Sequence, residues 1–188
     1  MRLFAEKGYN STSVADILKE SGANSGSLYH YFQTKQGLLI AVLEMYRDGI
    51  EMMLIQPAWA GVEDPIDKVF ALLARYRELL VMTECSFGCP IGSLALEIHE
   101  PDPPVRELLT ANFNRWIDFV ESCFKAAQDR LSPSPDARAL AQFVLTTMEG
   151  GVMLARTHRT LYAYDVSVAV LKDYISRLQT DNQNQTKP

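Results

Sequence analysis

Residues 8–39 constrain the fold of this chain more than any other stretch, because they combine two short helical segments, a glycine turn and the start of a longer helix. Ser13 is placed to cap the first short helix, and Asp16, three residues later, completes a capping box. Gly22 permits the left-handed backbone that ends this helix, and a second helix over residues 25–31 follows directly. Two helices joined by such a short turn are typical of a helix-turn-helix that reads DNA.

The second of these helices exposes groups that suit contacts with nucleic acid. Asn24 or Ser25 caps it, while Leu28 and Phe32 are expected to point inward. Hydroxyl, ring and imidazole groups on its outer surface can donate to phosphates or stack against sugar and base edges. Together with the caps and a lysine at the start of the next helix, the residues expected to contact DNA are Ser13, Asn24, Ser25, Ser27, Tyr29, His30, Tyr31 and Lys35.

A dense set of residues in this part of the chain matches a family signature: Leu3, Phe4, Gly8, Tyr9, Thr12, Ser13, Ile17, Gly22, Gly26, Ser27, Leu28, Tyr29, Tyr31, Phe32, Lys35 and Leu38. At these residues the chain resembles the TetR/AcrR family of transcriptional regulators. The resemblance implies an all-α fold, with a three-helix helix-turn-helix head followed by a helical bundle that binds a ligand and dimerises. Because the family's first helix normally begins further upstream, we expect residues 1–45 to form a DNA-binding domain with an incomplete first helix.

The charge balance does not predict a strongly basic DNA-binding surface. The chain has a formal net charge of −5, and residues 1–48 hold five Lys or Arg and five Asp or Glu. This part is therefore neutral, and the rest of the chain carries the whole −5. A neutral reading head implies modest non-specific binding and dependence on paired half-sites. We therefore expect a homodimer on a palindromic operator in double-stranded DNA.

From residue 35 onward, apolar residues recur at helical spacing, with breaks rich in Pro or Gly between the periodic stretches. The spacing predicts helices over residues 34–55, 65–83, 90–99, 105–131 and 165–178. Another helix, capped by Ser134 and Pro135, is predicted to reach Ala155. We expect residues 46–179 to form the ligand-binding and dimerisation domain. The tail, 180–188, has nothing to bury and is expected to be disordered.

A pair of glycines stands in the middle of an otherwise regular helix, where it costs about 2 kcal/mol relative to alanine. We expect these glycines to allow close approach of two backbones, and the resemblance places the dimer interface on the last two helices. The predicted interface residues are Gly150, Gly151, Val152, Leu171 and Tyr174. A helix crossing within one subunit is the alternative explanation of the glycine pair.

A ligand cavity in a helical bundle has no spacing signature, so its residues are predicted from their chemistry. The candidates are Tyr76, Cys89, Phe113, Trp116 and Met148, whose bulky or adaptable side chains suit an apolar pocket. Ordinary core packing is the alternative for each of them. The acidic excess of the body mildly favours a neutral or cationic small molecule.

Residues 88–97, GCPIGSLALE, are similar to a GC..G.LA.E segment found in a subset of TetR-family regulators, some of which respond to electrophiles or oxidants. Cys85 and Cys89 lie four residues apart at the amino end of a helix, where the helix dipole favours a thiolate. A small buried role for Cys89 is the alternative. The cysteine spacing, with no nearby pair of His, does not fit zinc, so no metal site is expected.

The sequence contains no Ser-His-Asp arrangement, phosphate-binding loop, dinucleotide-binding fingerprint or HExxH motif. We therefore expect neither an enzyme nor a bound cofactor. No run of 18 apolar residues and no secretory signal occurs, and three cysteines do not suggest a disulfide framework. A cytoplasmic protein without a membrane span is expected.

The predicted function is a ligand-responsive, DNA-binding transcriptional regulator, most often a repressor in this family, which a small molecule releases from its operator. One alternative is a small-molecule-binding helical protein that has lost DNA binding together with its first helix. Another alternative is a regulator that senses thiol-reactive electrophiles.

Overall fold

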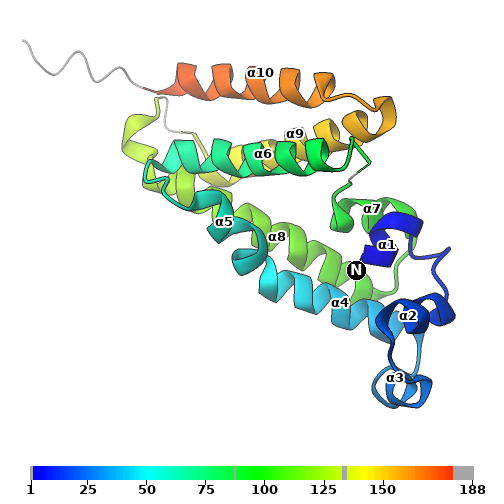
Figure 1. The fold of residues 1–188 in the computed structure, drawn as a ribbon. Coiled ribbons are helices and arrows are strands. Elements are labelled where there is room, and N and C mark those ends of the chain that lie inside the picture. The colour runs from blue at the N-terminus through cyan, green and yellow to red at the C-terminus, as the bar shows by residue number, and fades with distance from the viewer. Residues whose placement is uncertain (1, 87, 133–134, 180–188) are drawn as a thin grey trace, which may run out of the picture. The chain divides into compact units, whose positions relative to one another are not determined.

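The computed structural model describes residues 2–86, 88–132 and 135–179, and these are helical throughout apart from short connections (Figure 1). No β-strand occurs within these ranges; a single isolated bridge joins Leu131 to Gln179. The all-α prediction is therefore confirmed. None of the described helices is both long and apolar enough to cross a membrane.

The chain packs as two compact units that do not follow the boundary predicted near residue 45. The first unit comprises Met1–Glu51 and Gly88–Arg115, and the second comprises Met52–Phe87 and Trp116–Pro188. Residues 88–115 therefore pack with the amino-terminal helices rather than with the remainder of the predicted body.

The first unit contains the helices α1 (Arg2–Lys7), α2 (Val14–Ser21), α3 (Ser25–Tyr31), α4 (Lys35–Ile50) and α7 (Pro90–Glu97), with the amino-terminal part of α8 (Pro103–Ala126). Its buried core draws on four of these helices and consists of Phe4, Leu39, Leu43, Cys89, Ile91, Leu94, Val105 and Leu109. The buried Asn112 side chain links α8 to α4 by donating to the Leu43 carbonyl at 3.0 Å.

The long helix predicted over residues 34–55 is present, but its hydrogen bonding changes part of the way along. After α4 the chain continues as a π-helical turn, η1 (Glu51–Ile55), and then as the short helix α5 (Gln56–Trp59). Such turns are rare and insert one extra residue per turn of helix. Periodicity cannot reveal this change, because apolar spacing is nearly the same on both sides of it.

The second unit contains α6 (Pro65–Met82), the carboxy-terminal part of α8, a 3-10 turn η2 (Gln128–Arg130), α9 (Ala137–His158) and α10 (Tyr162–Leu178). Helix α6 begins as predicted, with Pro65 in its first turn and the Asp64 carboxylate accepting from the Ile66 and Asp67 amides. The Arg130 guanidinium also binds Asp64, and this hydrogen bond is the main cause that lowers the pKa of Asp64 to about 2.

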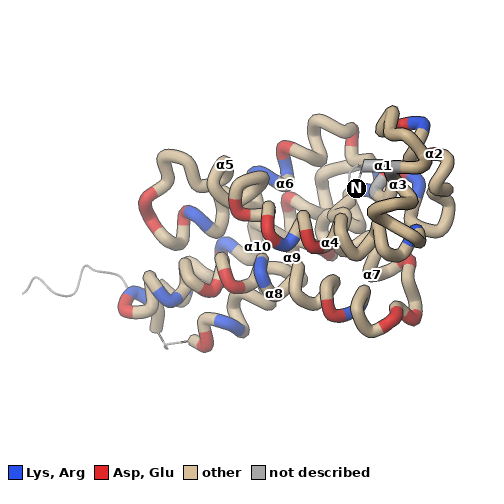
Figure 2. Tube along the Cα trace, turned by 90° about the horizontal axis from the view of Figure 1, so that it is seen from below, with Lys and Arg blue, Asp and Glu red and all other residues tan. Residues whose placement is uncertain are grey.

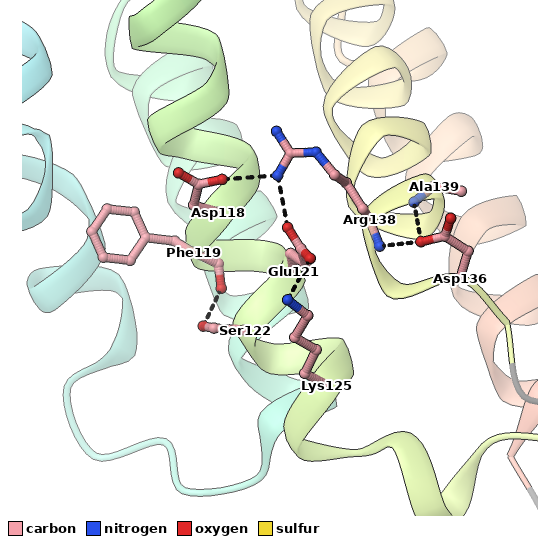
Figure 3. A network of polar contacts seen from close by, with 8 residues as sticks. All are labelled: Asp118, Phe119, Glu121, Ser122, Lys125, Asp136, Arg138 and Ala139. Atoms are coloured by element: carbon pink, nitrogen blue, oxygen red, sulfur yellow. Dashed lines mark hydrogen bonds and ion pairs between the residues drawn. The ribbon is translucent and has the colours of Figure 1, made fainter.

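Helices α9 and α10 lie side by side and antiparallel (Figure 1). Asp136 caps α9 by accepting from the Arg138 and Ala139 amides, whereas the predicted cap Ser134 lies outside the described residues. Arg138 also joins α9 to α8 through Asp118 at 2.9 Å and Glu121 at 2.7 Å (Figure 3). Helix α10 begins at Tyr162, three residues before the predicted start.

Candidate functional site

Helix α2 begins and ends as the sequence predicts. The Ser13 hydroxyl accepts from the Asp16 amide at 3.0 Å, and the Asp16 carboxylate accepts from the Ser13 amide at 2.9 Å. A further hydrogen bond from the Ser13 hydroxyl is the largest of the contacts that lower the pKa of Asp16 to about 2. Gly22 ends the helix with a φ of 65°, and its amide donates to the Leu18 carbonyl. The capping box and the left-handed glycine are therefore confirmed.

Helix α3 follows α2 after three residues and is capped by Asn24, whose side-chain oxygen accepts from the Gly26 amide at 2.8 Å. At its other end, the Phe32 amide donates to the Leu28 carbonyl at 2.7 Å. Both ends of this short helix are thus fixed by local hydrogen bonds. The pair α2 and α3 has the form of a helix-turn-helix, in which the second helix enters the major groove.

The outer surface of α3 is free to meet a partner. Tyr29 and Tyr31 are 53% and 76% exposed, and Ser25 and His30 are exposed as well. The rings of His30 and Tyr31 meet edge to face at 5.2 Å. No Lys, Arg, Asp or Glu occurs in α3, which is tan throughout in Figure 2. The helix therefore offers hydroxyls, rings and an imidazole; the side chain of the predicted Ser27 lies outside the described residues.

Besides the His30–Tyr31 ring pair, three of the predicted DNA-contacting residues have intramolecular contacts that hold the helix-turn-helix. Ser13 and Asn24 serve as helix caps. The Lys35 ammonium lies 4.3 Å from the centroid of the Tyr9 ring and donates to the Asn10 carbonyl at 3.4 Å. Lys35 therefore helps to hold the segment between α1 and α2, a role that its position in the sequence did not suggest.

The predicted ligand-binding residues fall into the cores of different units. Tyr76, Trp116 and Met148 are buried in the second unit, whereas Cys89 is buried in the first and Phe113 packs against the core there. Trp116 is 3% exposed, and its indole Nε1 has no hydrogen-bond partner in the part of the chain that the structure describes. Buried donors are normally paired, so this one is a candidate contact for a bound molecule.

The cysteines are buried in the folded chain. The Cys89 sulfur accepts from the Gly92 amide at 3.5 Å, so Cys89 caps α7. Burial also raises the pKa of Cys123 to about 11. Among the described residues, no group of three or more His, Cys, Asp or Glu could hold a metal ion.

The two glycines of α9 have different surroundings, which corrects part of the predicted interface. A Cβ on Gly151 would lie 2.9 Å from Cδ2 and 3.3 Å from Cα of Tyr164, so this glycine is needed where α9 crosses α10 in the same chain. Val152 and Leu171 are also buried within the chain. Gly151 therefore fits the alternative explanation, in which the glycine allows two helices of one subunit to cross closely.

Gly150 points in a different direction, and among the described residues no heavy atom outside its own stretch of helix lies within 4 Å of an added Cβ. The same two helices carry an exposed apolar face, defined by Phe143, Met153, Leu154, Tyr162, Val166, Val170 and Tyr174. Four of these residues recur every fourth position along α10, and Phe143 contacts Tyr174 with ring centroids 6.0 Å apart. Large apolar side chains that are exposed together on two neighbouring helices are typical of interaction sites.

Comparison with known proteins agrees with this architecture. The family model of bacterial regulatory proteins of the tetR family matches residues 1–42, and that of the C-terminal domain of LmrA/YxaF-like transcriptional regulators matches residues 65–164. The HTH-type transcriptional regulator LmrA of Bacillus subtilis is 32% identical over 83% of this chain and 81% of its own length. YxaF of the same organism is 30% identical over 84% of this chain and 81% of its own length. The HTH-type regulator Rv0196 of Mycobacterium tuberculosis is 33% identical over 87% and 84%.

Solved structures show the same fold. The regulatory protein TetR from Rhodobacter sphaeroides superposes with a TM-score of 0.83, is 25% identical, and is matched over 92% of this chain and 93% of its own. The reduced form of Escherichia coli NemR is 20% identical and superposes with a TM-score of 0.78, matched over 92% of this chain and 90% of its own. The helix-turn-helix head, the helical second unit and these matches together show that the chain belongs to the TetR family of bacterial transcriptional regulators, which are DNA-binding proteins and not enzymes.

Proposed function

We propose that this regulator is a homodimeric repressor that reads a palindromic operator through α3 and leaves it when a small molecule binds the second unit. The observation that carries the proposal is α3 itself, a helix capped at both ends whose exposed surface offers Ser25, Tyr29, His30 and Tyr31. A regulator of this kind works where the bacterial chromosome is, which places it in the cytoplasm.

The composition of α3 favours reading by hydrogen bonds and stacking over strong electrostatic attraction. A head without net charge has weak affinity for DNA in general, because non-specific binding depends mainly on cationic contacts with phosphates. Two heads about 34 Å apart, one turn of the duplex, add their contacts on a palindromic site. Dimerisation therefore supplies the affinity that one head lacks.

The exposed apolar face of α9 and α10 supports the dimer. Its residues would otherwise expose large apolar side chains to water, and burying them against the same face of a second copy is favourable. Gly150 lies on this side of α9 with open space around it, which suits close approach of a partner helix. Of the residues predicted from the sequence, Gly150 and Tyr174 remain in the proposed interface.

The proposed ligand is a neutral or cationic small molecule with an acceptor atom. Trp116 Nε1 has no hydrogen-bond partner among the described residues and can only donate, so it favours a carbonyl, ether or hydroxyl oxygen in the bound molecule. The acidic balance of the chain outside the reading head favours a neutral or cationic compound over an anion. Regulation then requires different ligand affinities in the DNA-binding and the released state.

Operator binding is tested on a duplex that the wild-type protein selects from a random pool. Tyr29→Ala and His30→Ala should each weaken binding by about tenfold, the factor that corresponds to roughly 1.4 kcal/mol. His158→Ala is the matched control for His30→Ala, because His158 is also exposed but lies at the end of α9. If both α3 variants bind as tightly as the wild type, α3 is not the reading helix.

Ligand binding is tested by native mass spectrometry of the purified protein, followed by titration of any compound that is found bound. Trp116→Phe should keep the fold, because an aromatic ring is retained. It should weaken the binding of that compound, because the indole donor is lost. Equal affinity of the wild type and Trp116→Phe would exclude Trp116 Nε1 as a ligand contact.

A further inference from the structure

The segment over residues 88–97 ends with a carboxylate that reaches the amino-terminal helices. Glu97 Oε2 accepts a hydrogen bond from the Tyr9 amide at 2.6 Å, and Oε1 accepts one from the Asn10 amide at 2.7 Å. Both amides belong to the connection between α1 and α2, beyond the end of one helix and before the start of the other. One carboxylate therefore fixes two successive backbone donors through charge-assisted hydrogen bonds.

Gly8 makes room for this carboxylate. A Cβ at this position would lie 2.9 Å from each of the two Glu97 oxygens, which is closer than real contacts allow. Gly8 also has a φ of 84°, a conformation that side chains disfavour. The backbone at the end of α1 thus leaves room for the Glu97 carboxylate in the position where it accepts the two hydrogen bonds.

Other contacts hold the remaining sides of the same connection. The fully buried Thr12 donates its hydroxyl to the Gly8 carbonyl at 2.6 Å. Lys35, from α4, packs over the Tyr9 ring and donates to the Asn10 carbonyl. The connection leads directly into the Ser13 cap of α2, so its position determines where the helix-turn-helix begins.

Glu97 is itself held in place because α7 belongs to the core of the first unit. Ile91 and Leu94 of α7 are buried in the same cluster as Phe4 of α1 and Leu39 of α4. At the amino end of α7, the Cys89 cap is buried in that cluster as well. The carboxylate therefore stands at the end of a helix that is anchored in the core as far as Leu94.

From these contacts we propose that Glu97 is a positioning residue for DNA reading. It acts by fixing the α1–α2 connection to α7, so that α2 and α3 present their surface in one orientation. This role rests on the proposed operator-binding function, and it makes α7 part of the DNA-reading unit although α7 lies far from α3 in the sequence.

Amide hydrogen exchange tests the contact without DNA. In the wild type, the Tyr9 and Asn10 amides should exchange slowly, whereas Glu97→Gln should speed the exchange of at least one of them by about tenfold or more, because glutamine keeps one acceptor oxygen but its amide nitrogen cannot accept a hydrogen bond. Glu100→Gln is the matched control, since it removes the same charge from an exposed residue nearby. Unprotected Tyr9 and Asn10 amides in the wild type would overturn the proposal, even if a variant does not fold.

Operator titration tests the consequence on the duplex selected by the wild type. Glu97→Gln and Gly8→Ala should each weaken binding by about tenfold, and the double variant should be little worse than either, because both substitutions remove one contact. The thermal midpoints show that each variant is folded at the titration temperature. If Glu97→Gln binds like the wild type, the positioning role is wrong; if the wild type itself selects no duplex, the proposed function fails and the exchange data still decide the contact.

Discussion

Gly150 and Gly151 are neighbours in α9, so alanine substitutions at the two positions form a matched pair. Each substitution replaces a helix-interior glycine and removes the same backbone freedom from the unfolded chain. Only Gly151 faces the Tyr164 ring, which is 1% exposed and is tied by its hydroxyl to the Leu73 carbonyl at 2.7 Å. Because the ring is held at both ends, it cannot swing aside to admit a methyl group.

The two substitutions are expected to change the free energy of unfolding differently. Gly150→Ala should stabilise the fold by about 1 kcal/mol through helix propensity, since an added Cβ meets nothing within 4 Å. Gly151→Ala gains the same amount but overpacks the crossing, which costs about 1–3 kcal/mol. The Gly150→Ala variant should therefore be more stable than the Gly151→Ala variant by about 1–3 kcal/mol, or at least about 2–4 °C in melting temperature for a chain of this size.

Circular dichroism melts of the wild type and both variants measure this difference. Sedimentation must show the same oligomeric state for all three proteins, because Gly150 lies on the proposed dimer face and dimer dissociation alters the melting temperature. A Gly151→Ala protein that melts at or above the temperature of Gly150→Ala would refute the crossing contact as the reason for this glycine.

Three further outcomes are expected. Val170→Asp, on the exposed apolar face of α10, should convert the dimer into a folded monomer in sedimentation, whereas Ser176→Asp, which adds the same charge away from that face, should not. The thiols of the native protein should react with Ellman's reagent much more slowly than in urea, because all three are buried; a fast-reacting Cys89 would instead support the electrophile-sensing alternative. The fold lowers the pKa of Asp64 to about 2. Its contribution to the free energy of unfolding is therefore fully present above about pH 4 and is lost as the pH falls toward 2. Arg130→Gln should raise that pKa in a carbon-13 NMR titration and reduce the associated acid destabilisation.

The local features of the reading head were predictable because each depends on residues within a few positions of one another. Ser13 with Asp16, Gly22 and Asn24 carry their structural roles in their own chemistry and spacing, so the caps and the turn follow from the sequence. The helices of the second unit were likewise predictable from apolar periodicity, although Asp136 rather than Ser134 caps α9.

The features that sequence reasoning missed depend on contacts between distant segments. Glu97 lies 88 residues from Tyr9, and no local sequence pattern predicts that its carboxylate accepts a hydrogen bond from the Tyr9 amide. The surroundings of Gly150 and Gly151 differ because only one side of α9 packs against Tyr164. A single sequence does not predict which side that is. The position of Lys35 at the start of a helix suggests a contact with a DNA phosphate. It does not reveal that the Lys35 ammonium packs over the Tyr9 ring. The grouping of α7 with the head is a property of packing alone.

The mass of the complex with the selected operator tests the central claim most directly. Sedimentation or native mass spectrometry should find two chains, each of 21.1 kDa, on a duplex that carries both half-sites, and much weaker binding to a duplex cut to one half-site. One chain on the full operator, or equal affinity for the single half-site, would contradict a dimer that reads DNA with two paired heads.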